Sequence, residues 1–150
     1  MTTAYDVPPK HLIDALTKKL QSEQLIVPPE WSKFVRTGVH TEKTPVDPNW
    51  WFVRCASVLR KIYINDGIGI EHLRNEYGGY RDRGSKPNRA ESGSGAIARN
   101  IVHQLEKAGY VTAIKGKGRI LTPKGKSFLD NTAHEVMQGL ITVHPELKKY

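Results

Sequence analysis

The sequence predicts a mainly α-helical protein with a winged-helix-like body, and three observations support this prediction. The first is the helical spacing of apolar residues in four segments: 8–23, 49–64, 94–108 and 123–139. The second is a pair of short strand-like segments, 110–114 and 120–122, that can join as a β-hairpin. The third is the order of elements over 49–139, which is helix, short helix, helix, hairpin and helix. A winged-helix module, with three helices and a hairpin wing, has this order.

The first 48 residues are predicted to form a helical arm that packs on this body. Asp6, followed by two prolines, is a helix-capping signal. Apolar residues recur at helical spacing after it, at Leu12, Ile13, Leu16 and Leu20. A second, short helix over 30–36 would bury its apolar side chains, which are Trp31, Phe34 and Val35. The polar segment 38–48 is the expected linker to the body.

Helix 49–64 is expected at the centre of the fold. Its apolar side chains cover an arc of about 160°, which requires contact with several neighbours. They are Trp51, Phe52, Cys55, Ala56, Val58, Leu59, Ile62 and Tyr63. The other arc holds Trp50, Arg54, Arg60 and Lys61 and no acid. Three cations beside an aromatic ring suit phosphate contact with base stacking. The alternative is that these cations pair with acids elsewhere in the fold.

The remaining elements are bounded by capping and turn residues. A short helix near 70–77 stops at a pair of glycines, and helix 94–108 ends before Gly109, a typical C′ residue. Thr122 followed by Pro123 opens the last helix. Segment 80–91 is expected to be a basic loop, and 140–150 a tail that frays. The 150 residues are expected to form one domain, with arm 1–48 on body 49–139.

The net charge of +8 is concentrated in the body. Residues 1–48 contain six Lys or Arg and six Asp or Glu, whereas residues 49–150 contain seventeen and nine. The sequence pI is near 9.6. A basic excess confined to one part of a chain favours a polyanionic partner.

Besides the cations of the central helix, further cations lie in two clusters and on the face of another helix. The basic loop contributes Arg81, Arg83, Lys86 and Arg89, the wing contributes Lys115, Lys117 and Arg119, and helix 94–108 contributes Arg99. We expect these groups to border helix 94–108 as one continuous basic surface. Solvated loops, and lysines that protect strand edges, are the alternatives. Arg99 could also pair with Glu106, which lies on the same side of its helix.

The residue patterns of enzymes and metal sites are missing. None of the six histidines pairs with another at helical spacing, and the one cysteine, Cys55, lies on the apolar arc. Phosphate-binding glycine motifs and a nucleophile elbow do not occur. We therefore expect no catalysis, metal, cofactor or small-molecule substrate. The lack of a signal peptide and of a long apolar run predicts a soluble, cytoplasmic protein without a membrane partner. We also expect it to be a monomer when free.

Several blocks, in the right order, resemble one known family. The first runs from Asp47 to Arg54 (DPNWWFVR) and continues with Ala56-Ser57 and 59–63 (LRKIY). Later blocks are Tyr77-Gly78-Gly79, Arg83-Gly84, Ala98-Arg99, Leu105-Glu106 and the stretch from Gly118 to Gly125. These residues resemble small-subunit ribosomal protein nineteen of archaea and eukaryotes, and an archaeal member in particular.

This resemblance implies a place in the head of the small subunit and a role in its maturation. It also implies contacts with small-subunit ribosomal RNA and with neighbouring ribosomal proteins. The family's RNA-facing positions correspond to Arg54, Arg60, Lys61, Arg99 and the loop 81–89. Asn100 departs from the pattern, because eukaryotic members tend to be basic there.

Two other classes of function fit part of the sequence. A winged-helix transcription regulator would read DNA bases with helix 94–108, but most of the basic excess lies off that helix. A protein-interaction adaptor would explain the neutral arm 1–48 and leave the charge of +8 unexplained.

Overall fold

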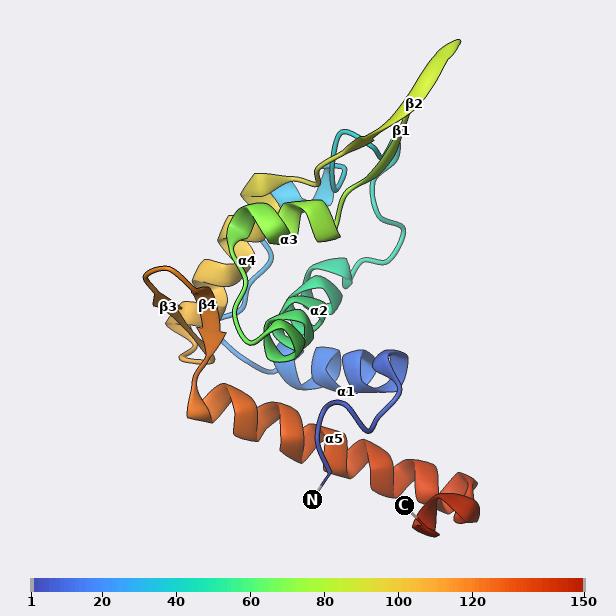
Figure 1. The fold of residues 1–150 in the computed structure, drawn as a ribbon, viewed down its shortest axis with the longest axis vertical. Helices are drawn as coiled ribbons and strands as arrows, with labels where there is room; N and C mark the ends of the chain where they lie inside the picture. The colour runs from blue at the N-terminus through green and yellow to red at the C-terminus, as the bar shows by residue number, and fades with distance from the viewer. Residues whose placement is uncertain (1, 150) are drawn as a thin grey trace.

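The chain is mainly α-helical and has the winged-helix order that the sequence predicts (Figure 1). The structure is a computed structural model that describes residues 2–149. The body consists of α2 (Trp50–Asn65), α3 (Ile70–Glu76), α4 (Gly95–Lys107) and a wing, the antiparallel hairpin of β3 (Val111–Ile114) and β4 (Gly118–Leu121). Helix α1 (Pro9–Gln21) precedes the body, and α5 (Pro123–Val143) follows it.

Helix α2 lies between the other helices, as its wide apolar arc predicts. Trp51, Cys55 and Leu59 have no exposed surface. Around them, α1, α4 and α5 contribute fully buried side chains to the same core, which are Leu12, Leu16, Leu20, Ile101, Leu105, Leu129 and Ala133. One continuous core therefore joins α1 to the winged-helix body.

The predicted cap of α5 is confirmed, and α4 is capped by a side chain as well. The Ser94 hydroxyl accepts a hydrogen bond from the Ile97 amide (3.4 Å), and the Thr122 hydroxyl accepts one from the Gly125 amide (3.1 Å). Gly109 has φ +77°, as a C′ residue requires. The expected Asp6 cap is wrong, because its carboxylate accepts from the Thr3 amide instead (2.7 Å). Pro8 stands at the N-cap position of α1 without a side-chain bond.

Three other local expectations are also wrong. Segment 80–91 is not a loop: β1 (Gly79–Arg83) and β2 (Lys86–Glu91) form a second antiparallel hairpin. The helix expected over 30–36 is a single 3-10 turn, Glu30–Lys33. The C-terminal segment is not a fraying tail, because α5 continues through Gly139 to Val143 and a 3-10 turn spans Pro145–Lys149. Leu140 packs against the core, which explains why the helix continues.

The shortened 3-10 turn changes the surface of the arm. Phe34 is 81% exposed and Trp31 is 37% exposed, whereas the sequence analysis expected both side chains to be buried with Val35. Val35 is half-buried. Within residues 2–149, no helix is long and apolar enough to cross a membrane.

Candidate nucleic-acid interface

The hairpin of β1 and β2, here called the ribbon (residues 79–91), projects away from the helices (Figure 1). Its four cations, Arg81, Arg83, Lys86 and Arg89, are all exposed. Arg81 lies directly opposite Arg89, and Arg83 lies opposite Lys86. Like charges that face each other across strands destabilise a hairpin, and an isolated two-stranded hairpin is only marginally stable. This arrangement favours the binding of a polyanion.

Acids do little to offset the charge of the ribbon. The carboxylate of Asp82 accepts a hydrogen bond from the Gly84 amide (2.9 Å), so it stabilises the turn between the strands. Among residues 2–149, no ion pair joins an acid to any of the four ribbon cations. Their charges therefore remain available to phosphates.

The root of the ribbon is fixed to the body by close backbone contacts. The Gly93 amide donates to the Arg74 carbonyl (2.8 Å), and the Ser94 amide donates to the Thr37 carbonyl (3.0 Å). A Cβ at Gly78 would lie 2.3 Å from the Glu91 carbonyl oxygen, so only glycine permits this approach. The ribbon therefore leaves the body in a defined direction.

The wing carries cations of two kinds. Lys115 and Lys117 are exposed at its tip. Arg119 is half-buried, and its Nε donates to the Glu106 carboxylate on α4 (3.2 Å). The backbone of Arg119 also exchanges two hydrogen bonds with Ile68 (2.9 and 3.0 Å). Arg119 thus attaches the wing to the body, while the two lysines face solvent.

Arg54 on α2 is less accessible than helix periodicity suggests. Its guanidinium lies 4.1 Å from the centre of the Tyr77 ring, and the Tyr77 hydroxyl shares a hydrogen bond with the Ser57 hydroxyl (2.7 Å). Burial lowers the pKa of Arg54, although a guanidinium keeps its charge in proteins. Leu73 and Ile97 line the same small pocket. Arg54 therefore helps to hold α2, α3 and α4 together.

The other residues predicted on the outer arc of α2 are half-buried. Lys61 forms an ion pair with Glu76 of α3, and this hydrogen bond lowers the pKa of the Glu76 carboxyl. For Lys61 the salt-bridge alternative is the one observed. The Nε atom of Arg60 is buried and has no hydrogen-bond partner among the described residues. Trp50 is half-buried and lies edge-on to Trp51, with ring centres 5.4 Å apart.

The exposed face of α4 lies between the two hairpins. Arg99 is exposed, and Glu106 pairs with Arg119 and, at 4.0 Å, with His103 instead of with Arg99. The Asn100 amide donates back to the Ala96 carbonyl of its own helix (2.8 Å). The ribbon precedes α4 and the wing follows it, so the length of this 13-residue helix separates them. That length is roughly 20 Å. The ribbon cations and the wing lysines thus lie toward opposite ends of α4, and Arg99 is exposed on the helix between them.

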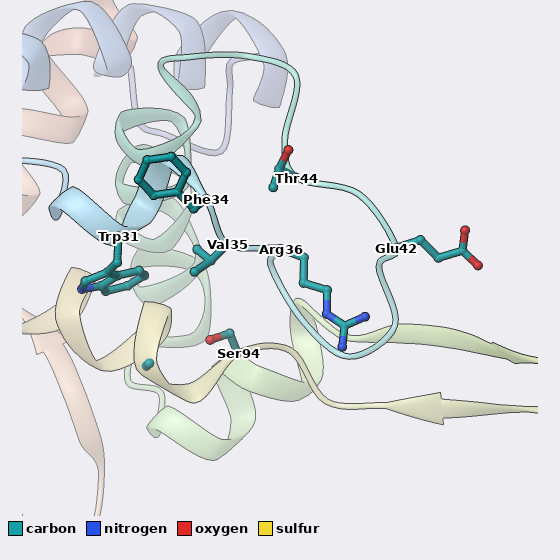
Figure 2. A pocket seen from close by; sticks show the side chains of 8 residues that line it. Trp31, Phe34, Val35, Arg36, Glu42, Thr44 and Ser94 are labelled. Atoms are coloured by element: carbon teal, nitrogen blue, oxygen red, sulfur yellow. The ribbon is translucent and has the colours of Figure 1, made fainter.

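A hollow beside the root of the ribbon was missed by the sequence analysis. It has a volume of about 510 Å³. Its lining residues are Trp31, Phe34, Val35, Arg36, Glu42, Thr44, Ser94 and Ala96 (Figure 2). The one available sequence signal was the placing of Trp31 and Phe34 among cations, at Lys33 and Arg36. Aromatic rings interleaved with cations are typical of nucleic-acid-binding surfaces.

Reactive groups are not gathered anywhere in the described part of the chain. Cys55 is fully buried, as its place on the apolar arc predicts, and burial raises the pKa of its thiol far above the usual range. A buried thiol of this kind is inert. Among residues 2–149, no three His, Cys, Asp or Glu side chains are placed to hold a metal ion.

Comparison with known proteins gives consistent matches over the whole chain. A family model described as ribosomal protein S19e matches residues 3–139. The small ribosomal subunit protein eS19 of Thermoplasma acidophilum is 45% identical over 150 residues, which cover 100% of this chain and 99% of the relative. The eS19 of Aeropyrum pernix is 43% identical over 152 residues, with the same coverage. The eS19 of Oryza sativa is 38% identical and covers 89% of this chain and 92% of its own.

Proposed function

The chain belongs to the ribosomal protein S19e family, and we propose that it is a structural, non-enzymatic constituent of the small ribosomal subunit. In this role it binds small-subunit ribosomal RNA, mainly through phosphate contacts. Its place is the head of the subunit, beside neighbouring ribosomal proteins, in cytoplasmic ribosomes. It contributes to the maturation of the subunit and is a monomer when free. The names of its relatives support the ribosomal role, and the charges described above support the RNA contacts.

The observation that carries the RNA-binding part is the like-charged ribbon. Two cation pairs, Arg81 with Arg89 and Arg83 with Lys86, face each other on a hairpin that the helices do not cover (Figure 1). Phosphates placed between such cations would remove their repulsion and would order the hairpin. Lys115 and Lys117, on the wing, and Arg99, on α4, extend the proposed contact.

The same proposal gives a secondary role to the half-buried residues of α2 and to Arg119. Lys61 can exchange its carboxylate partner, Glu76, for a phosphate, because the pair is partly exposed to solvent. Arg54 and Arg119 are half-buried and hold neighbouring elements together. Arg60 is also half-buried, and Trp50 packs on Trp51. Their proposed contribution to RNA binding is therefore smaller than that of the ribbon.

The test compares two variants that each lose four positive charges. One carries Arg81→Gln, Arg83→Gln, Lys86→Gln and Arg89→Gln in the ribbon. The matched control carries Lys10→Gln, Lys18→Gln, Lys33→Gln and Lys43→Gln, at exposed positions of the neutral arm. Binding to transcribed small-subunit ribosomal RNA is measured over a range of salt concentrations. Each lost phosphate contact reduces the slope of log K against log[salt] by about 0.7–0.9.

We expect the ribbon variant to lose about 2.8–3.6 units of slope if all four cations contact phosphates, and the arm variant less than about 1. The ribbon variant should also fail to co-sediment with small subunits at physiological salt, while its thermal stability is unchanged. Equal slopes for the two variants would refute the role of the ribbon. A preference of the native protein for duplex DNA over its ribosomal RNA would instead support a winged-helix transcription regulator.

A further inference from the structure

The hollow beside the ribbon has an aromatic wall and a mixed polar rim (Figure 2). Trp31 and Phe34 lie on one side, and Glu42 and Thr44 belong to the loop that closes the other side. Ser94, at the N-terminus of α4, lies below them. The hollow is therefore built by the N-terminal arm and α4 together.

A chain of contacts holds the aromatic wall in place. The Trp31 ring packs edge-on against the buried Trp51 ring, with centres 5.7 Å apart at 84°. The indole Nε1 of Trp51 donates to the Gln104 side-chain oxygen (3.0 Å), and the Gln104 amide donates to the Val27 carbonyl (2.8 Å). The Phe34 amide donates to the Trp31 carbonyl (3.2 Å). Packing thus fixes the Trp31 ring, and the backbone of Phe34 is tied to it, whereas the Phe34 side chain is 81% exposed.

The charges around the hollow favour a nucleic acid over an apolar protein segment. Arg36 lines the hollow, and among the described residues its only hydrogen bond runs from its Nη1 atom to the Thr41 carbonyl (3.3 Å). The Glu42 carboxylate points away from the hollow (Figure 2). An exposed aromatic ring beside an arginine with free N–H groups can stack on a base and bind its phosphate.

The hollow is also continuous with the root of the ribbon. Ser94, which lines the hollow, directly follows Gly93, and Gly93 pairs with Gly38 in an isolated β-bridge. An RNA strand that leaves the ribbon toward the body would therefore meet the aromatic wall. Because this position adjoins the proposed phosphate contacts, the two features can act on one RNA.

We propose that the hollow receives one unpaired nucleobase of the small-subunit ribosomal RNA, stacked on Phe34, with an adjacent phosphate bound by Arg36. Trp31 forms the fixed wall behind the base. The proposal rests on the ribosomal RNA binding proposed above and assigns a second, chemically different contact to it. Stacking tolerates any base, so the hollow selects an unpaired nucleotide and not a sequence.

Substitutions of Phe34 distinguish a base from an apolar protein side chain. Phe34→Leu keeps an apolar group and removes the aromatic face, whereas Phe34→Trp keeps the face. With transcribed small-subunit ribosomal RNA, we expect Phe34→Leu and Phe34→Ala to weaken binding by roughly 5- to 100-fold. We expect Phe34→Trp to bind within about threefold of the native protein. All three should melt like the native protein, because Phe34 is exposed.

A photoreactive benzophenone amino acid at position 34 identifies the occupant in assembled small subunits. A crosslink to an unpaired nucleotide supports the proposal, and a crosslink to a ribosomal protein overturns it. The control places the same amino acid at Val46, which is 99% exposed and lies outside the residues that line the hollow. Equal RNA crosslinking from positions 34 and 46 would also overturn the proposal.

The ribbon variant separates this proposal from the one on which it rests. If the ribbon variant loses RNA binding and Phe34→Leu binds normally, the base pocket is refuted and the phosphate contact stands. If neither variant changes RNA binding, both proposals are refuted.

Discussion

The stack of Arg54 on Tyr77 leads to a prediction about stability that the sequence alone would not give. Helix periodicity places Arg54 on the outer side of α2, where replacement by alanine costs less than about 1 kcal/mol. In the structure its guanidinium lies 4.1 Å from the Tyr77 ring, and its side chain is half-buried between three helices. Arg54→Ala should therefore destabilise the fold measurably.

The magnitude follows from two losses. A cation–π contact contributes about 0.5–1 kcal/mol when exposed and about 2 kcal/mol when desolvated. Removal of the aliphatic stem of Arg54 adds a packing loss, because the stem shares its pocket with Leu73 and Ile97. We expect a total of about 1.5–3 kcal/mol in the free energy of unfolding. For a chain of this length the melting temperature should fall by about 3–12 °C.

Urea denaturation and thermal melts of the native protein and a set of variants, Arg54→Ala among them, test this prediction. Leu59→Ala, at a fully buried position of the same helix, should cost about 2–5 kcal/mol. Arg99→Ala, at an exposed cation, should stay within about 0.5 kcal/mol of the native protein. A double-mutant cycle with Tyr77→Leu should give a coupling of about 0.5–2 kcal/mol. If Arg54→Ala were as stable as Arg99→Ala, the structural role assigned to this stack would be refuted.

Three further predictions concern single contacts. Glu76→Gln should free Lys61 for a phosphate and steepen the salt dependence of RNA binding by about 0.7–0.9, which fluorescence titrations would measure. Because Lys61 lowers the pKa of the Glu76 carboxyl below its ordinary 4.5, the ion pair stabilises the fold above that pH, and this stabilisation is lost as the pH falls. Urea denaturation between about pH 3 and 6 should show that Glu76→Gln lacks this pH-dependent part of the free energy of unfolding. Gly125→Ala should lower the free energy of unfolding by about 1–3 kcal/mol in thermal melts, because its Cβ would lie 2.3 Å from the Tyr110 carbonyl oxygen. Gly139→Ala, with open space around it, should stabilise α5 by about 0.5–1 kcal/mol.

The helices that position the site were predictable because local signals agree with one another there. In α4, the apolar spacing and Gly109 indicate the same end of the helix. Thr122 and Pro123 mark the start of α5 in the same way. By contrast, α5 continues beyond Gly139 because of tertiary packing by Leu140, which a weak local pattern does not show.

The ribbon was missed for a physical reason. A strand is recognised by alternation between a buried and an exposed face, but residues 80–90 are exposed throughout. Only the glycines at the root, Gly78 and Gly93, approach other backbone closely, and these contacts are tertiary. The sequence therefore predicts the composition of this cationic cluster and leaves its geometry undetermined.

The partners of individual cations could not be predicted from the sequence either. Glu76 is fifteen residues from Lys61, so their ion pair arises only when α3 packs against α2. The exposure of Phe34 depends on a 3-10 turn that ends at Lys33, one residue before it. Periodicity assigns a side to each residue of a regular helix, and it fails where the helix is shorter than assumed.

The ribbon is a projecting hairpin that is joined to the body at Gly93 and Ser94. The four cations lie on its projecting part, and its root is joined by backbone hydrogen bonds to Arg74 and Thr37. A tilt that RNA imposes on the projecting part would act on the backbone next to Ser94, which also lines the aromatic hollow. A force on the phosphate contacts of the ribbon would thus change the shape of the proposed base site. By thermodynamic reciprocity, a base seated on Phe34 would in turn bias the angle at which the ribbon stands.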